Sequence, residues 1–134
     1  METDTLIIGG GLAGIGLASQ LAERKLDFQL FEARDRLGGR ILTEKLNGAN
    51  FDLGPAWFWP GQPRIARLVE RLGLKSFGQY SMGEILFENE QGYLRRGYGF
   101  SSMQGSWRLD GGLGELIESL AHTVPSVRVH LSTP

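Results

Sequence analysis

The chain has 134 residues, a net charge of −1, 41% hydrophobic and 22% charged residues, and no cysteine. Such a composition is typical of one globular domain, excludes disulfides and thiolate chemistry, and gives no electrostatic reason to expect nucleic acid or an anionic membrane as a partner. No apolar run approaches the roughly 20 residues of a membrane-spanning helix, and the N-terminus is acidic where a secretory signal is basic, so we expect a cytoplasmic protein.

The first thirty-one residues predict a strand, a helix and a second strand. The apolar run Leu6–Ile8 is typical of a parallel strand that is covered on both faces. Leu12–Arg24 has helical periodicity, and Phe28–Phe31 reads as the next strand. The apolar face expected for the helix consists of Gly14, Leu17, Ala18, Leu21 and Ala22. Together these elements have the size of a βαβ unit, so we predict an α/β fold with a parallel sheet.

A glycine-rich turn joins the first strand to the helix. Gly9, Gly11 and Gly14 form a G-x-G-x-x-G pattern, which holds the pyrophosphate of a dinucleotide when it lies between a strand and a helix. Glu32 ends the second strand, where a carboxylate accepts hydrogen bonds from an adenosine ribose and repels a 2′-phosphate. The pattern favours a dinucleotide site without NADP, and a glycine turn without a ligand is the alternative.

The rest of the chain predicts a mixture of short strands and helices. In chain order these are strands Ile41–Lys45 and Asn50–Leu53, a helix Gln62–Leu72 capped by Gly73, a hairpin of Glu84–Glu88 with Gly92–Arg96, a strand Ser106–Leu109, a helix opened by Gly111 and Gly112, and a final strand Val127–Leu131. A doubly wound sheet has further elements after such a strand, so we expect an incomplete domain, a fragment of a longer protein.

Three motifs together resemble the N-terminus of the flavin-containing amine oxidase superfamily, the monoamine oxidase-like FAD-dependent oxidoreductases. They are Gly9–Gly14, Glu32–Arg34 and Gly38–Ile41, and the similarity continues in Phe51–Trp57 and Arg108–Leu116. The resemblance implies a Rossmann-like FAD-binding domain over residues 1–134. Residues 58–105 would be a small β-hairpin and helical insertion that belongs to the substrate side.

The same resemblance implies FAD as the cofactor. Glycines 9, 11 and 14 would hold the pyrophosphate, Glu32 the ribose and Arg40 a phosphate oxygen, while Gly54–Trp57 would lie against the flavin. The full implied set is Gly9, Gly11, Leu12, Ala13, Gly14, Glu32, Ala33, Arg34, Gly39, Arg40, Gly54, Pro55, Ala56 and Trp57. No residue is assigned as catalytic, and no metal-ligand spacing is present in the sequence.

The functional hypothesis is oxidation of an amine-like substrate by hydride transfer to FAD, and the resemblance does not identify the substrate. The family's second half is absent, so this chain alone is expected to be inactive and to associate with itself or with a missing C-terminal half. A non-catalytic nucleotide-binding remnant and an NAD-binding domain are the alternatives. Trp57, Phe58 and Trp59 are typical either of a pocket wall or of ordinary packing.

Overall fold

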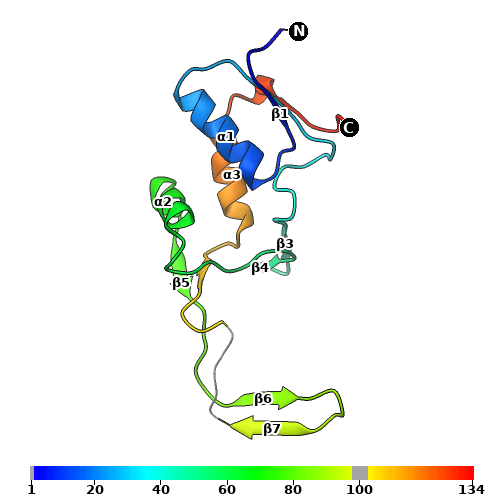
Figure 1. Ribbon diagram of the computed structural model, residues 1–134, viewed down its shortest axis with the longest axis vertical. Coiled ribbons are helices and arrows are strands. Elements are labelled where there is room, and N and C mark those ends of the chain that lie inside the picture. Colours follow the sequence, from blue (N-terminus) through cyan, green and yellow to red (C-terminus); the bar gives the residue numbers. More distant parts are fainter. Residues whose placement is uncertain (1, 98–102) are drawn as a thin grey trace.

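A computed structural model describes residues 2–97 and 103–134. A three-stranded parallel sheet lies at one end, formed by β1 (Leu6–Ile8), β2 (Gln29–Phe31) and β9 (Val129–His130) in the order β1-β2-β9 (Figure 1). Ile7 of β1 pairs with Leu30 of β2. Leu30 in turn pairs with Val129 of β9, which is about a hundred residues further along the chain. The predicted α/β architecture with a parallel sheet is confirmed.

Helix α1 (Leu12–Glu23) packs on β1 and β2, and α3 (Gly114–His122) packs on α1 (Figure 1). The core between them contains mainly aliphatic side chains, including Ile7, Ile15, Ala18, Leu30, Leu116 and Leu120. A hydrogen bond from the hydroxyl of Thr123 to that of Ser19 (2.7 Å) links the two helices. The only polar side chain on the buried face of α1 therefore has a partner.

The predicted apolar face of α1 is confirmed at Ala18, which is buried, and at Leu21 and Ala22, which pack against the core, but it is wrong at Leu17. Ile15, Ala18 and Ser19 are the buried residues of this helix, whereas Leu17 is 46% exposed. Gly14 contacts the backbone of the preceding turn, and its neighbour Ile15 is the residue of the first helical turn that enters the core.

An antiparallel hairpin, β3 (Thr43–Leu46) and β4 (Ala49–Asp52), positions the start of α3. Asn47 and Gly48 have φ angles of 51° and 78°, which a two-residue hairpin turn requires. Oγ1 of Thr43 accepts a hydrogen bond from Gly114 N, and Oδ1 of Asp52 accepts one from Leu113 N. The hairpin thus caps the helix from a distant part of the chain.

Helix α2 (Pro63–Arg71) lies beside a second antiparallel pair, β5 (Ser76–Gly78) with β8 (Trp107–Leu109). Gly73 follows α2 with a φ of 65°, so the predicted cap is confirmed. The pair β6 (Ile85–Glu88) and β7 (Leu94–Gly97) forms the predicted hairpin, which extends away from the other elements (Figure 1).

The final strand is shorter than predicted. Residues Ser126–Arg128 form a 3₁₀ turn, η1, and Val127 is 80% exposed, so the strand begins only at Val129. Arg128 N donates a hydrogen bond to Pro125 O (3.0 Å), which closes a turn where the strand was predicted to begin. The alternation of valines therefore does not reflect an extended backbone here.

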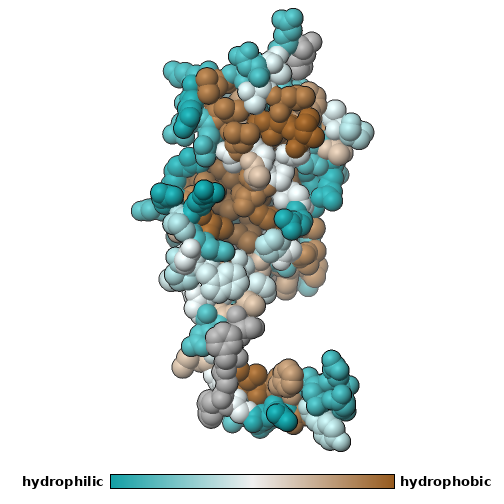
Figure 2. Space-filling view, in the orientation of Figure 1, coloured by the Kyte–Doolittle hydropathy of each residue, from teal (hydrophilic) through white to brown (hydrophobic). Residues whose placement is uncertain are grey.

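One face of the parallel sheet is apolar and uncovered. Leu6 is 58% exposed and Ile8 is 76% exposed, and they point away from the face on which α1 and α3 pack. Figure 2 shows hydrophobic residues gathered over the end of the molecule that holds the sheet. In the part of the chain that the structure describes, no helix is both long and apolar enough to span a bilayer.

Candidate functional site

The glycine turn between β1 and α1 is held by its own backbone. Gly9 has a φ of 100°, which favours glycine, and its N–H donates to the carbonyl of Phe31 (2.7 Å). A Cβ atom at Gly14 would overlap the carbonyl oxygen of Gly9, so the helix approaches the turn as closely as a backbone can. Gly11 is the N-cap of α1, whose first N–H groups have no partner within the helix.

Glu32 holds two backbone groups around this turn. Its Oε2 accepts a hydrogen bond from Gly10 N (2.6 Å) and its Oε1 accepts one from Arg34 N (2.9 Å). The hydrogen bond from Arg34 N is the main reason why the pKa of the Glu32 carboxyl lies below its usual value, followed by the bond from Gly10 N. The nearby positive charges of Arg34 and Arg36 lower this pKa further. The carboxylate is ionised, buried to 8% exposure, and retains lone pairs that can accept from a hydroxyl.

The second glycine pair lies against the first turn. Gly38 N donates to Gly10 O (2.8 Å), and Gly11 and Gly38 form a bridge between the two segments. The guanidinium of Arg36 donates to three carbonyls of this loop, those of Leu37, Gly39 and Ile41. Two motifs that are about 25 residues apart in sequence thus form one rigid backbone surface.

A cavity of about 1120 Å³ opens in front of this surface. Its described lining residues are Gly11, Leu12, Ala13, Arg34, Gly38, Gly39, Arg40, Ile41, Pro55, Trp57, Phe58, Gln62, Pro63, Arg64, Ile65 and Leu113. Three of these residues are arginines, and none of those described is acidic. Helix N-termini and guanidinium groups both bind phosphate, so the cavity suits a ligand that has both anionic and apolar parts.

Comparison with known proteins identifies the family. Residues 7–72 match the family described as "NAD(P)-binding Rossmann-like domain". The chain is 34% identical over 87 residues to putrescine oxidase of Kocuria rosea, covering 65% of this chain and 18% of that protein. It is 32% identical over 118 residues to a probable flavin-containing monoamine oxidase A of Dictyostelium discoideum, covering 88% of this chain and 25% of that protein. The chain belongs to the flavin-containing amine oxidase superfamily.

Two solved structures of amine oxidases agree with the fold. Wild-type putrescine oxidase bound to putrescine has a TM-score of 0.63 at 37% identity and covers 75% of this chain and 22% of that one. Cyclohexylamine oxidase from Brevibacterium oxydans IH-35A has a TM-score of 0.88 over 100% of this chain and 52% of that one, and at 14% identity it shows the fold alone. The chain spans 18–25% of the length of the two curated relatives compared above.

Eight of the residues predicted to bind the cofactor line the large cavity of this chain. They are Gly11, Leu12, Ala13, Arg34, Gly39, Arg40, Pro55 and Trp57. The other six, which are not among its lining residues, are Gly9, Gly14, Glu32, Ala33, Gly54 and Ala56. Gly54 resembles Gly14 in its packing, because a Cβ atom there would overlap the carbonyl oxygen of Arg40. The binding roles of all fourteen stay predictions.

Sequence reasoning missed the part of the cavity wall that α2 contributes. Gln62, Pro63, Arg64 and Ile65 come from the start of this helix, and Leu113 comes from the start of α3. Pro63 at the first helical position was a usable signal, because it marks a helix N-terminus that can face an anion. Nothing in the sequence pattern placed that terminus opposite the glycine turn.

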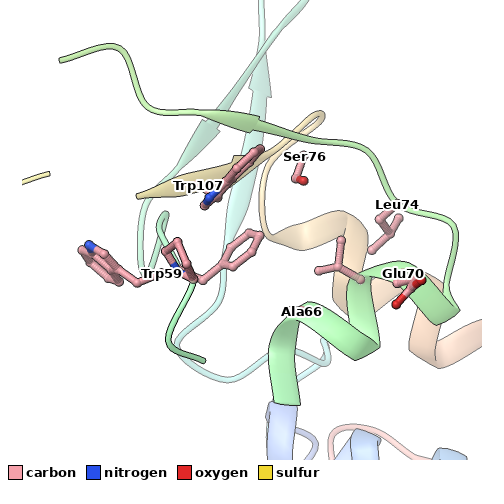
Figure 3. A pocket seen from close by; sticks show the side chains of 9 residues that line it. Trp59, Ala66, Glu70, Leu74, Ser76 and Trp107 are labelled. Atoms are coloured by element: carbon pink, nitrogen blue, oxygen red, sulfur yellow. The ribbon is translucent and has the colours of Figure 1, made fainter. Parts of the chain in front are cut away.

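The aromatic cluster divides between two cavities. Trp57 and Phe58 line the large cavity, whereas Trp59 lines a smaller one of about 320 Å³ that Phe58 shares. Figure 3 shows this smaller cavity between Trp59 and Trp107 on one side and Ala66, Glu70 and Leu74 of the α2 segment on the other. Phe58 is 6% exposed and belongs to the core, so the pocket-wall and packing interpretations both hold for parts of the cluster.

No metal centre is formed by the residues that the structure describes. Residues 2–97 and 103–134 contain no group of three or more histidine, aspartate or glutamate side chains placed to bind one ion. His122 lies in the last turn of α3, and His130 stacks on Phe31 with ring centroids 4.6 Å apart while its Nε2 lies 2.8 Å from Gln29 Oε1. His122 is exposed, whereas His130 is held by its contacts with Phe31 and Gln29.

Proposed function

We propose that this chain is the FAD-binding part of a flavin-dependent oxidoreductase that oxidises an amine by hydride transfer. The observation that carries the proposal is that one cavity is lined by Gly11 of the glycine turn, by three arginines and by the aromatic side chain of Trp57. Membership of the superfamily and the printed names of the relatives, putrescine oxidase and flavin-containing monoamine oxidase, support it. The substrate class follows from those names alone.

The residues present fit an extended dinucleotide. The N-terminus of α1 would face the pyrophosphate. Gly11 carries no side chain there, and a Cβ atom built on it would lie 3.9 Å from its nearest neighbour, so the space in front of its backbone is open. Arg34, Arg40 and Arg64 would neutralise the phosphates. Glu32 would accept from the ribose, and Pro55 and Trp57 would exclude water near the ring system. When bound, FAD would supply the hydride acceptor.

An NAD-binding domain is the second candidate, and the family description of residues 7–72 favours it. The experiment titrates the purified chain with FAD, NAD and NADP in parallel. Calorimetry measures the binding of each, and the visible absorbance reports on bound flavin. We expect FAD to bind most tightly and NADP least tightly, because Glu32 is ionised and repels a 2′-phosphate. Tighter binding of NAD than of FAD would support the second candidate, and binding of none would favour a remnant without a ligand.

We also propose that amine turnover requires residues beyond those in this sequence. The exposed face of Leu6 and Ile8 supports pairing of the sheet with a further chain segment or with a second copy of this chain. Analytical ultracentrifugation tests this: wild-type protein should associate, and replacement of both residues by threonine should reduce association.

A cytoplasmic location is part of the proposal, and cell fractionation with an antibody to the native protein tests it.

A further inference from the structure

The carboxyl group of Asp52 is the most deeply buried acid that the proposed function leaves unexplained. Its side chain is 1% exposed at the end of β4. Oδ1 accepts hydrogen bonds from Thr43 Oγ1 (2.6 Å) and Leu113 N (2.9 Å), whereas Oδ2 is buried without a hydrogen-bond partner. Burial of a carboxylate oxygen costs free energy unless a positive charge compensates it. The cation closest to Oδ2 is therefore the group to consider.

That cation is Arg108 on β8. Its Nη2 lies 3.6 Å from Asp52 Oδ2, and its Nε is also buried without a hydrogen-bond partner. The guanidinium carbon of Arg108 lies 6.0 Å from the centre of the Trp57 ring, which is within the range of a cation–π contact. Arg108 therefore stands between a fixed negative charge and an aromatic face.

The Trp57 ring is held from a second direction as well. Its Nε1 donates a hydrogen bond to Gln79 Oε1 (2.9 Å), and Gln79 N donates to Ser106 O (2.9 Å). Gln79 follows β5 and Ser106 precedes β8, so one strand pair carries both groups that contact the ring. Trp57 is still 38% exposed and lines the large cavity, so its orientation depends on these contacts and not on burial.

We propose that Asp52 and Arg108 are positioning residues that fix the orientation of the Trp57 indole in the wall of the large cavity. Asp52 thereby has two separate tasks: Oδ1 caps α3, and Oδ2 orients Arg108. The effect of this arrangement on FAD binding rests on the proposed function, whereas the orientation of the indole does not.

The test measures hydrogen exchange at the indole N–H of Trp57 in ¹⁵N-labelled full chain, with its signal assigned from Trp57→Phe. The variants are Arg108→Met and Asp52→Asn, and the amide of the latter keeps an oxygen that can accept from Leu113 N. We expect the exchange rate of this N–H to rise about two- to fivefold in both, the change that loss of a partly exposed cation–π contact supports. Arg71→Met, which removes an exposed ion pair with Glu23 (3.5 Å), is the matched control and should change nothing.

The backbone amide protection of α3 separates the two tasks of Asp52. Faster exchange at Trp57 with unchanged protection of α3 supports the proposal. An unchanged rate at Trp57 overturns it, as does a rise that occurs only together with loss of protection in α3, because that result would mean a capping role alone. Arg108→Lys retains the charge without the planar guanidinium, and it should restore part of the wild-type rate.

A parallel titration with FAD tests the functional consequence. If the proposed function holds, Arg108→Met and Asp52→Asn should weaken FAD binding about two- to fivefold, in proportion to the loosened ring. If wild-type protein binds no FAD, the proposed function fails while the indole measurement still decides whether Asp52 and Arg108 position Trp57. The two failures are therefore distinguishable.

Discussion

The glycine-turn region and the β6–β7 hairpin are both built from short local patterns, yet they differ in what fixes their geometry. In the first, Ile7, Ile15 and Leu30 are buried between the sheet and two helices. In the second, Leu86, Phe87, Tyr93 and Leu94 are between 60% and 71% exposed. An isolated two-stranded hairpin is marginally stable in water, whereas a packed βαβ unit constrains its own turn. Precise ligand geometry is therefore expected only in the first region.

The largest effect expected in the glycine turn comes from Gly14, where there is no free space. Gly14→Ala places a Cβ atom onto the carbonyl oxygen of Gly9, so the free energy of unfolding should fall by about 3 kcal/mol as in a severe overpacking. Urea denaturation measures it. Gly16→Ala in the same helix is the control, since nothing lies within 4 Å of its added Cβ atom, and it should be neutral or slightly stabilising. Equal stability of the two variants would mean that the turn is not closely packed.

The next effect concerns charge in the cavity. Arg40→Ala and Arg64→Ala should each weaken FAD binding about tenfold or more, because a charge-assisted hydrogen bond contributes about 1.5–3 kcal/mol. Arg95→Ala on the β6–β7 hairpin, where the residue is exposed, is the matched control and should leave the affinity unchanged. Isothermal titration calorimetry distinguishes these cases, and a loss of equal size in all three variants would reduce the effect to net charge.

A smaller effect follows from the carboxylate of Glu32. Its pKa is lower in the folded chain than in the unfolded one, so it contributes stability above its usual pKa, and this contribution is lost as the pH falls through the folded-state value. Glu32→Gln removes the contribution. The difference in unfolding free energy between wild type and variant should therefore be constant near pH 7 and shrink below about pH 4. A difference that stays constant to pH 2.5 would contradict the lowered pKa.

The smallest expected effect lies in the hairpin. Phe87→Ser changes a 60% exposed side chain, so the free energy of unfolding should change by less than about 0.5 kcal/mol. Leu30→Ala, at a position with 0% exposure in β2, should cost about 2–5 kcal/mol by the same thermal or urea measurement. Similar losses for the two substitutions would show that the hairpin is part of the cooperative core.

The features that could be predicted were those that depend on residues adjacent in the sequence. The glycine turn and the Gly73 cap were both evident in the sequence, because each needs a φ that glycine adopts easily. Strand β5 was not predicted, since its three residues are exposed and carry no alternation. Its pairing with β8 depends on a partner about thirty residues away.

The cavity was predictable only on the side that the motifs form. Gly11, Gly39 and Arg40 follow from their spacing, whereas Arg64 and Leu113 reach the cavity because α2 and α3 begin at its edge. The same holds for the contact between Arg108 and Trp57, which joins β8 to the segment after β4. Such contacts are set by tertiary packing, and a single sequence carries no local signal for them.

Gly11 offers the most direct test of the proposal that this turn holds the pyrophosphate of FAD. The nearest atom to a Cβ added at Gly11 is 3.9 Å away, and its φ of −70° suits any residue, so Gly11→Ala should fold with wild-type stability. The measurement is the FAD dissociation constant of the two proteins, with urea denaturation as the check on folding. We predict that the added methyl group weakens FAD binding about tenfold or more, because it stands where the phosphate approaches the backbone. Equal affinity for FAD in two equally stable proteins would contradict the account.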